Sequence, residues 1–202
     1  MTARDAAKSA VFWVATAAVA PALLSYSIRR KIIGGDRALE GSTQALALVP
    51  GIVGQYLRRA FLVRVLAHCH PSATIEFGTI FSRTSARIEA GAYVGPRCHL
   101  GSVHIGRDVL LAAGVHVPSG PNTHGVEDLS RPIKEQPGRQ RTIRIGAGSW
   151  IGSAAVILAD VGCDSVVGAG AVVTQTIPDR VLAAGVPARV LRSREALTRQ
   201  SA

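Results

Sequence analysis

An aliphatic residue recurs at every sixth position over much of the chain after about residue 73, and a glycine or another small residue often follows it. Aligned on that aliphatic residue, the chain reads IEAGAY from Ile88, VGPRCH from Val94, LGSVH from Leu100, IGRDVL from Ile105, LAAGVH from Leu111, IGAGSW from Ile145, IGSAAV from Ile151, VGAGAV from Val167 and VTQTIP from Val173. Glycine takes the second position at residues 95, 101, 106, 146, 152 and 168. A repeat of this length decides the fold before single elements are named.

This period excludes a helix face, which recurs at three and four residues, and a half-buried strand, which alternates. It indicates a short strand followed by a corner. The aliphatic side chain fills the interior, while glycine permits a sharp turn and a close approach of stacked backbones. Three such edges close one triangular coil, and stacked coils pair in parallel around a continuous aliphatic column. The sequence therefore predicts a mainly β fold, a parallel β-helix.

Two apolar stretches precede the repeat. Residues 9–28 carry no charge, end at the basic run 29–31, and are just long enough to span a bilayer. Thr16, Pro21 and many alanines in this stretch suit lipid less well than leucine does. The second stretch, Ala45 to Leu66, carries three arginines between aliphatic positions, a pattern suited to a membrane surface. We expect a shallow hairpin with both ends cytoplasmic; the alternative is two ordinary helices packed against the repeat.

Composition narrows the class of partner. Hydrophobic residues make up 48% of the chain and aromatic residues only 4%, so the core must consist of small aliphatic side chains. The formal charge of +10 favours anionic partners, but no nucleic-acid-binding motif is present, and we expect no nucleic-acid partner. Cys69, Cys98 and Cys163 are odd in number and lack metal-ligand spacing, which argues against both disulfides and zinc. A reducing cytoplasm is the simplest compartment.

The hexads resemble those of the hexapeptide-repeat acyltransferases over roughly residues 73–192. This resemblance implies a left-handed coil, against the usual right-handed preference of parallel crossovers. The predicted domains are a helical, membrane-associated segment over residues 1–70 and a left-handed β-helix over 71–192. A loop at 119–142 interrupts the β-helix, and a tail at 193–202 forms a short helix at most.

The loop carries the candidate catalytic residue. Its segment GPNTHG, from Gly120, resembles the catalytic loop of galactoside, maltose and related sugar O-acetyltransferases, and His124 stands where their histidine stands. Imidazole is partly neutral at physiological pH and can take a proton from an attacking hydroxyl. We expect Asn122 to bind the acceptor and Glu127 or Asp128 to orient the imidazole. The alternative is a solvated loop histidine.

The resemblance also implies a site for coenzyme A. In SWIGS, from Ser149, the backbone at Ser153 would contact the CoA arm or the developing oxyanion, and Trp150 would form a wall. The small residues after Val167 resemble a groove wall for pantetheine. The segment AAGVPARVLR resembles the family's C-terminal motif, whose arginines would bind the CoA phosphates. The expected cofactor-binding residues are Ser153, Ala169, Thr174, Arg189 and Arg192.

Three departures from the family pattern concern affinity and acceptor identity. Gln175 stands where lysine is common, which removes one phosphate contact. Residues 157–166 are two short of two hexads, which predicts a shortened corner near residues 161–163. Arg97, together with Cys98 and His99, lies where sugar acetyltransferases often place an acceptor-binding asparagine, and we expect Arg97 to bind the acceptor.

The interpretation we favour is direct transfer of an acetyl group from acetyl-CoA to a hydroxyl of a sugar or glycan precursor, without a metal. No paired nucleophilic serine or cysteine is apparent. The resemblance implies a homotrimer with its sites between subunits. The apolar N-terminal part and the basic charge favour an acceptor at the cytoplasmic face of the membrane, such as a lipid-linked sugar in polysaccharide biosynthesis.

Other functions fit the same scaffold, because a fold does not fix its substrate. Serine O-acetylation and amino-sugar N-acylation therefore stay open. A γ-class carbonic anhydrase shares the fold, and His99 and His104 match the spacing of two of its zinc ligands, but Val63 stands where the third would lie. A membrane-attached β-helix that binds but does not catalyse is the last alternative.

Overall fold

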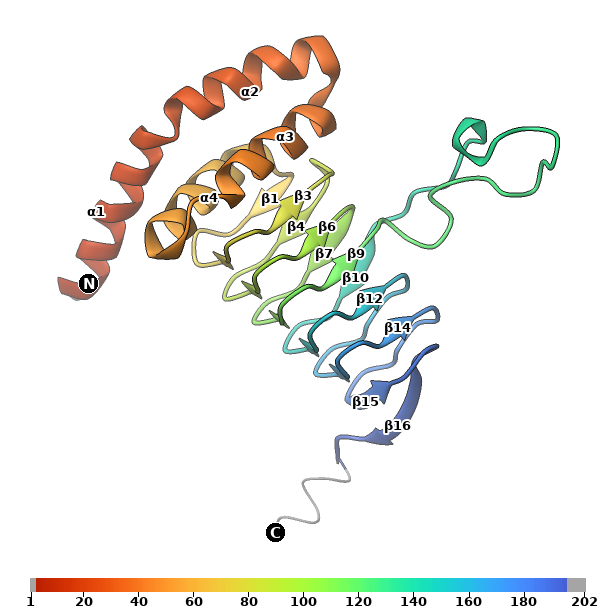
Figure 1. Ribbon diagram of the computed structural model, residues 1–202. Coiled ribbons are helices and arrows are strands. Elements are labelled where there is room, and N and C mark those ends of the chain that lie inside the picture. Colours follow the sequence, from red (N-terminus) through yellow and green to blue (C-terminus); the bar gives the residue numbers. More distant parts are fainter. Residues whose placement is uncertain (1–2, 196–202) are drawn as a thin grey trace.

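The computed structural model describes residues 3–195, with side chains from residue 11 onward. The chain begins with the helices α1 (Ala3–Ala18), α2 (Ala20–Ile33), α3 (Gly35–Ala47) and α4 (Gly51–Val65). From His68 onward it winds through short strands into a stack of coils, and the helices lie at one end of that stack (Figure 1). The N-terminal helical segment is thus a cap on the repeat.

The strands form three sheets. Sheet A contains β1 (His68–Cys69), β4 (Arg87–Ile88), β7 (Val103–Ile105) and β10 (Ile143–Ile145). Sheet B contains β2 (Thr74–Ile75), β5 (Tyr93–Val94), β8 (Leu110–Leu111), β11 (Trp150–Ile151), β13 (Val166–Val167), β15 (Val181–Ala184) and β16 (Arg189–Ser193). Sheet C contains β3 (Ile80–Phe81), β6 (His99–Leu100), β9 (His116–Val117), β12 (Val156–Ile157) and β14 (Val172–Val173). Neighbours come from successive coils and pair in parallel, except β15 with β16, so the predicted parallel β-helix is confirmed.

The aliphatic column of the hexads is the core. The first residue of each predicted hexad is at most 1% exposed: Ile88, Val94, Leu100, Ile105, Leu111, Ile145, Ile151, Val167 and Val173. The glycines after them lie against the next coil, since a Cβ on Gly106 would come within 2.7 Å of the amide nitrogen of Ala147. The missing residues are confirmed but lie before the expected corner at 161–163, because the short step runs between the core residues Ile157 and Val161, whereas Val161 and Val167 are a full hexad apart. Val161 joins sheet A through single bridges to Ile145 and Ile177.

Helix α4 closes the end of the aliphatic column. Phe61 and Leu62 are buried, and so is Arg58, at 2% exposure. The guanidinium of Arg58 donates to the carbonyl of Ile75 in the first coil at 3.0 Å and to that of Val49 at 2.7 Å. Burial lowers the pKa of Arg58, although Glu76 opposes this effect. Packing on the coils therefore accounts for the buried apolar positions of the second stretch, whereas Leu48, Ile52 and Val53 stay exposed.

Helices α1 and α2 keep an apolar face in solvent. Several large apolar side chains of this pair are 46–76% exposed, among them Trp13, Val14, Leu24, Ile28 and Ile32. The two helices meet at an angle of 46°. Pro21 lies in the first turn of α2 and has no N–H to donate to the preceding turn, which explains the break. Within residues 3–195 no single helix is long and apolar enough to cross a bilayer, whereas the bent pair passes the same test of length and composition.

The loop between β9 and β10 stands away from the coils as an arm (Figure 1). Its two limbs pair through backbone bonds, from the Arg141 amide to the Ser119 carbonyl at 3.0 Å and from the Arg139 amide to the Asn122 carbonyl at 2.6 Å. Near the tip, the buried side chain of Gln136 donates to the carbonyl of Asp128 at 2.7 Å. A short 3-10 helix, η1 (Ile133–Glu135), precedes Gln136. The predicted insertion is therefore an internally bonded arm.

Candidate functional site

Sheet C presents two histidines side by side on its outer surface. β6 and β9 pair in register, so that His99 lies opposite His116, with ring centroids 6.1 Å apart and an interplanar angle of 47°. Each histidine precedes a buried core residue, Leu100 or Val117. Because successive residues of a strand face opposite sides, the inward direction of these two aliphatic residues turns both imidazoles outward.

The two imidazoles line a cavity of about 270 Å³ at the base of the loop arm. His124 of the loop lies on the same cavity. The remaining lining residues come from the ends of sheet C strands and from both limbs of the loop: Ser82, Arg83, Val117, Pro118, Ser119, Thr123 and Gln140. The lining carries three imidazoles and one guanidinium but no carboxylate, so it offers hydrogen-bond donors and bases to a polar, hydroxyl-bearing ligand.

Arg83 connects this cavity to two other parts of the fold. Its Nε donates to Oε1 of Gln140 in the returning limb of the loop, at 2.9 Å. Its Nη1 lies 3.5 Å from Oδ2 of Asp36 in α3. The other oxygen of Asp36 accepts from the backbone amide of Thr84 at 2.8 Å. The helical cap thus helps to position one wall of the cavity that contains His124.

His124 also lines a second cavity, of about 420 Å³, formed by residues of the loop arm alone, together with Asn122, Glu127 and Asp128. The sequence grouped these four residues, and the structure does bring them around one space. The carboxylate of Asp128 accepts from the amide and the hydroxyl of Ser130, at 2.9 and 2.6 Å. These two bonds lower the pKa of Asp128. Among the described residues neither Glu127 nor Asp128 hydrogen-bonds to His124, so the expected orienting bond is absent from this arrangement.

The residues expected to bind CoA lie elsewhere on the coils. Ser153 and Ala169 occupy stacked corners between sheets B and C, where the carbonyl of Ser153 accepts from the amide of Gly170 at 2.8 Å. Thr174 follows β14, and all three residues are exposed. Trp150 is 51% exposed on sheet B, between Leu110 and Val166 in register. None of these residues lines the histidine cavity of the same chain.

Arg189 and Arg192 lie on β16, the antiparallel strand at the edge of sheet B. Arg192 is the register partner of Leu182, and Arg189 that of Ala184. Both side chains are exposed, and no carboxylate within the described part of the chain forms an ion pair with either one. Two guanidinium groups without a carboxylate partner on one strand can bind phosphates, although Arg189 also donates to the carbonyl of Ala188 at 3.0 Å.

Comparisons with known proteins place the chain in a family. A family model described as the hexapeptide repeat of succinyl-transferase matches residues 85–118 and 142–175. A galactoside O-acetyltransferase of Escherichia coli (strain K12) is 33% identical over 165 residues, which cover 70% of this chain and 80% of that protein. The chain belongs to the hexapeptide-repeat acyltransferase family. It is therefore an enzyme of the transferase class.

Solved structures of hexapeptide acyltransferases share the fold. A maltose O-acetyltransferase from Clostridium difficile 630 superimposes with a TM-score of 0.62 at 20% identity, covering 78% of this chain and 87% of that one. An N-acyltransferase from Bacillus cereus, AntD, solved with coenzyme A and dTDP-4-amino-4,6-dideoxyglucose, gives a TM-score of 0.52 at 16% identity, covering 64% and 78%. At these identities the likeness concerns the β-helix alone.

The structure does not support two expectations from the sequence, the acceptor-binding role of Arg97 and the pairing of His99 with His104 at one zinc site. Arg97 occupies a corner in a left-handed conformation, with φ 59°, where its amide donates to the carbonyl of Phe77 at 2.9 Å, and it does not line the histidine cavity. His99, two residues further on, does. His99 lies in sheet C and His104 in sheet A, where His104 bonds to Glu89 at 3.0 Å, so the pair with carbonic-anhydrase spacing does not face one site.

Beyond His124 and His99, the sequence assigned no role to the residues of the histidine cavity, among them Ser82, Arg83, His116 and Gln140. His116 could have been found from the sequence. It directly precedes a core aliphatic residue, as His99 does in the preceding coil.

The buried thiol of Cys98 is not a candidate nucleophile. Burial raises the pKa of Cys98 to about 11, which keeps it protonated at neutral pH.

Proposed function

We propose that this acyltransferase moves an acetyl group from acetyl-CoA to a hydroxyl of a sugar or glycan precursor, with His124 as general base. The observation that carries the proposal is the convergence of His124, His99 and His116 on one polar cavity. The name of the E. coli relative, a galactoside O-acetyltransferase, supports a sugar acceptor. The structure of AntD with coenzyme A supports an acyl-CoA donor.

The proposed reaction is a direct transfer. His124 takes the proton from the acceptor hydroxyl as its oxygen attacks the thioester carbonyl carbon. The tetrahedral intermediate then collapses, the carbon–sulfur bond breaks, and the imidazolium of His124 returns the proton to the departing sulfur of CoA. The products are the O-acetyl ester and free CoA thiol. Two observations favour this route over an acyl-enzyme. Cys98 is protonated, and among the described residues none of the cavity hydroxyls of Ser82, Ser119 and Thr123 hydrogen-bonds to an imidazole that could activate it.

We further propose a homotrimer in which each site is shared by two chains. Within one chain, His124 faces a cavity on sheet C, whereas Ser153 and Ala169 lie at a corner beside sheet B. A neighbouring copy that brings its corner to the His124 cavity would complete the site. In that arrangement Thr174, Arg189 and Arg192 hold the CoA arm and phosphates. No metal has a role in the proposed reaction.

The location we propose is the cytoplasmic face of a membrane, where the acceptor would be a lipid-linked sugar in polysaccharide biosynthesis. The exposed apolar face of α1 and α2 supports this proposal. The basic residues Arg29, Arg30 and Lys31 at the end of α2 and the net charge of +10 support it further. This part of the proposal stands apart from the chemistry, which needs no membrane.

A thiol-release assay tests the reaction. Acetyl-CoA is offered with free sugars, nucleotide sugars, lipid-linked sugars, amino sugars and serine, and the wild type is compared with His124→Ala. His104→Gln is the matched control, since His104 lies on sheet A away from the cavity. We expect release with a hydroxyl-bearing sugar that His124→Ala abolishes and His104→Gln retains. Release with serine or an amino group alone would replace the sugar-hydroxyl reading, and no release with any acceptor would favour a binding module.

A further inference from the structure

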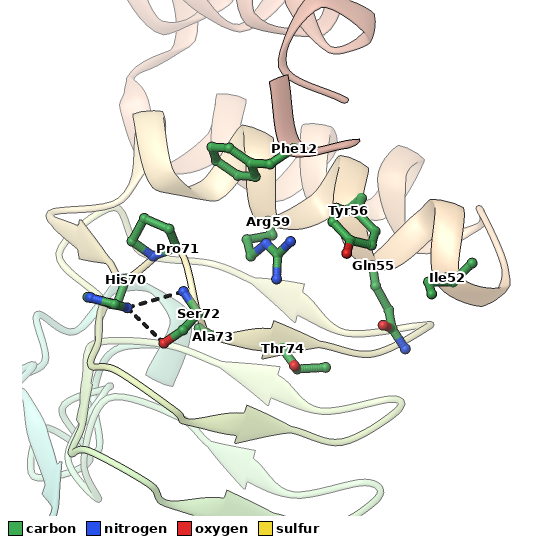
Figure 2. A pocket seen from close by; sticks show the side chains of 10 residues that line it. All are labelled: Phe12, Ile52, Gln55, Tyr56, Arg59, His70, Pro71, Ser72, Ala73 and Thr74. Carbon is green, nitrogen blue, oxygen red and sulfur yellow. Dashed lines mark hydrogen bonds between the residues drawn. The ribbon is translucent and has the colours of Figure 1, made fainter. Parts of the chain in front are cut away.

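A cavity of about 550 Å³ lies between the helical cap and the first coil. Figure 2 shows its walls: Phe12 of α1 and Tyr56 and Arg59 of α4 on one side, and Thr74 of the first coil on the other. The two cavities share no lining residue. A volume of this size accommodates a small-molecule ligand or a lipid headgroup.

Arg59 is the central charged group of this cavity. Its guanidinium carbon lies 4.5 Å from the ring centroid of Tyr56 and 5.5 Å from that of Phe12. Its Nε is buried and has no hydrogen-bond partner. Over residues 11–195 no carboxylate forms an ion pair with Arg59. Arg59 as a whole is only partly buried, so its unpartnered Nε and the lack of a counter-charge leave the guanidinium able to pair with an anionic ligand.

Some of the other polar groups of the cavity already form hydrogen bonds within the protein, and others do not. The hydroxyl of Ser72 donates to Nδ1 of His70 at 2.8 Å and accepts from the amide of Gly91 at 2.9 Å, so its one donor proton is already engaged. The hydroxyls of Tyr56 and Thr74 make no side-chain hydrogen bond within the part of the chain that the structure describes. No carboxylate lines the cavity. Two hydroxyl donors beside one guanidinium match the several oxygens of a phosphate.

Exposed apolar side chains lie close to this cavity on both helices that line it. Ile52 lines the cavity and is also 67% exposed, and its neighbour Val53 is 61% exposed. On α1, the residues next to Phe12 include Trp13, which is 63% exposed, and Val14, which is 70% exposed. A ligand whose phosphate reaches Arg59 would therefore leave its apolar part against exposed aliphatic and aromatic side chains. That combination describes an amphiphile.

We propose that the cavity around Arg59 binds the phosphate headgroup of an anionic lipid. The site is separate from acyl transfer, and it gives the proposed membrane attachment a specific recognition element in place of general basic charge. The guanidinium of Arg59, held between the rings of Phe12 and Tyr56, pairs with the phosphate. The hydroxyls of Tyr56 and Thr74 donate to its remaining oxygens, and the acyl chains lie along Ile52 and α1.

The test is co-sedimentation of the full chain with phosphatidylcholine vesicles that contain or lack phosphatidylglycerol, at about physiological ionic strength. Arg59→Gln is compared with Arg64→Gln, which removes the same charge from an exposed site on the same helix outside the cavity. We expect binding to phosphatidylglycerol vesicles only, a loss of about tenfold or more in Arg59→Gln, and little change in Arg64→Gln. Equal losses in the two variants, or equal binding to both kinds of vesicle, would overturn the proposal.

Tyr56→Phe keeps the ring that packs on Arg59 and removes only a hydroxyl, so it tests the site even if Arg59→Gln does not fold. We expect a severalfold loss of binding to phosphatidylglycerol vesicles. Binding equal to that of the wild type would contradict the site. Water-soluble glycerol phosphate, added as a competitor, distinguishes the sources of phosphate. Binding of glycerol phosphate without vesicle binding would exclude a lipid. Thiol release with a soluble acceptor is measured on the same variants. If a variant loses vesicle binding but keeps thiol release, the lipid site is separate from the acyl-transfer site.

Discussion

The imidazole of His99 lies directly opposite that of His116 in the next coil, with ring centroids 6.1 Å apart, on the cavity that His124 enters from the loop. Two imidazoles on a cavity wall suit an acceptor with several hydroxyls, because each ring can donate or accept one hydrogen bond. Their position on rigid strands suits binding, whereas the loop position of His124 suits access to the reacting hydroxyl.

Removal of these wall imidazoles is expected to weaken acceptor binding. His99→Ala and His116→Ala should each raise the KM for the acceptor about tenfold, as expected for one lost hydrogen bond to a polar ligand, with a smaller change in kcat. Because the rings are neighbours, the double variant should lose less than the sum of the two single losses. Steady-state thiol release over a range of acceptor concentrations measures both constants. Unchanged KM values in both single variants would remove these histidines from the acceptor site.

Loss of the loop imidazole is expected to act on the chemical step. His124→Ala should lower kcat by about 10²- to 10⁴-fold, the usual contribution of a general base, and leave the KM for acetyl-CoA near its wild-type value. The contrast with His99→Ala separates a base from a binding group. Single-turnover measurements with saturating acceptor provide the decisive comparison. If kcat survives in His124→Ala while KM rises, His124 binds the acceptor and another group takes the proton.

The tight stacking of coils predicts where a single methyl group is not tolerated. In Gly106→Ala the new Cβ would lie 2.7 Å from the amide nitrogen of Ala147 and 2.9 Å from the carbonyl oxygen of Ile145 in the next coil. Both are backbone atoms that cannot rotate away, so we expect a loss of about 1–3 kcal/mol in the free energy of unfolding. Gly35→Ala is the control, because its nearest neighbours stand at 3.6 and 3.7 Å. Denaturant unfolding of both variants should show a loss only in Gly106→Ala.

The aliphatic column could be predicted from the sequence. Every coil needs an inward-facing aliphatic residue at the same positions, so these residues recur in the sequence with a regular spacing. The outward positions have no such requirement. The hexads place His99 and His116 at the same phase, but that the two stack on each other depends on the length of the coil between them, which the register of β6 and β9 supplies. For the same reason the sequence favoured Arg97 as an acceptor-binding residue, although Arg97 stands at a corner and does not line the cavity.

The role of the second apolar stretch was equally hidden. Arginines between aliphatic residues suit a membrane surface, yet Arg58 is buried and donates to the carbonyls of Leu46, Val49 and Ile75. Those carbonyls belong to the end of α3, the following turn and the first coil, which are distant in sequence. Local patterning records that a side chain is amphipathic, but not whether water, lipid or backbone carbonyls receive its polar end.

Alkaline pH should destabilise the fold through Cys98. Burial raises the pKa of this thiol to about 11 in the folded chain, from a usual value of 9.0. Below about pH 9 the thiol is protonated in both states and has no effect on stability; above it, only the unfolded thiol ionises, so stability is lost as the pH rises toward the folded pKa. Between about pH 7 and pH 10 the wild type should lose about 1 kcal/mol relative to Cys98→Ala. A constant difference between the two proteins across this range would contradict the assignment.

A shared site in a homotrimer makes a prediction that a site within one chain does not. His124→Ala removes the base but leaves the corner at Ala169 open, whereas Ala169→Trp fills that exposed corner and keeps His124. Each variant alone should be inactive. In a mixed cyclic trimer, one of the three interfaces combines an intact His124 with an intact corner, so mixed trimers purified through two different tags should recover about a third of wild-type activity. Recovery requires that the two residues come from different chains. Mixed trimers as inactive as their parents would show that His124 and Ala169 serve the same site within one chain, and a monomer in solution with full activity would lead to the same conclusion.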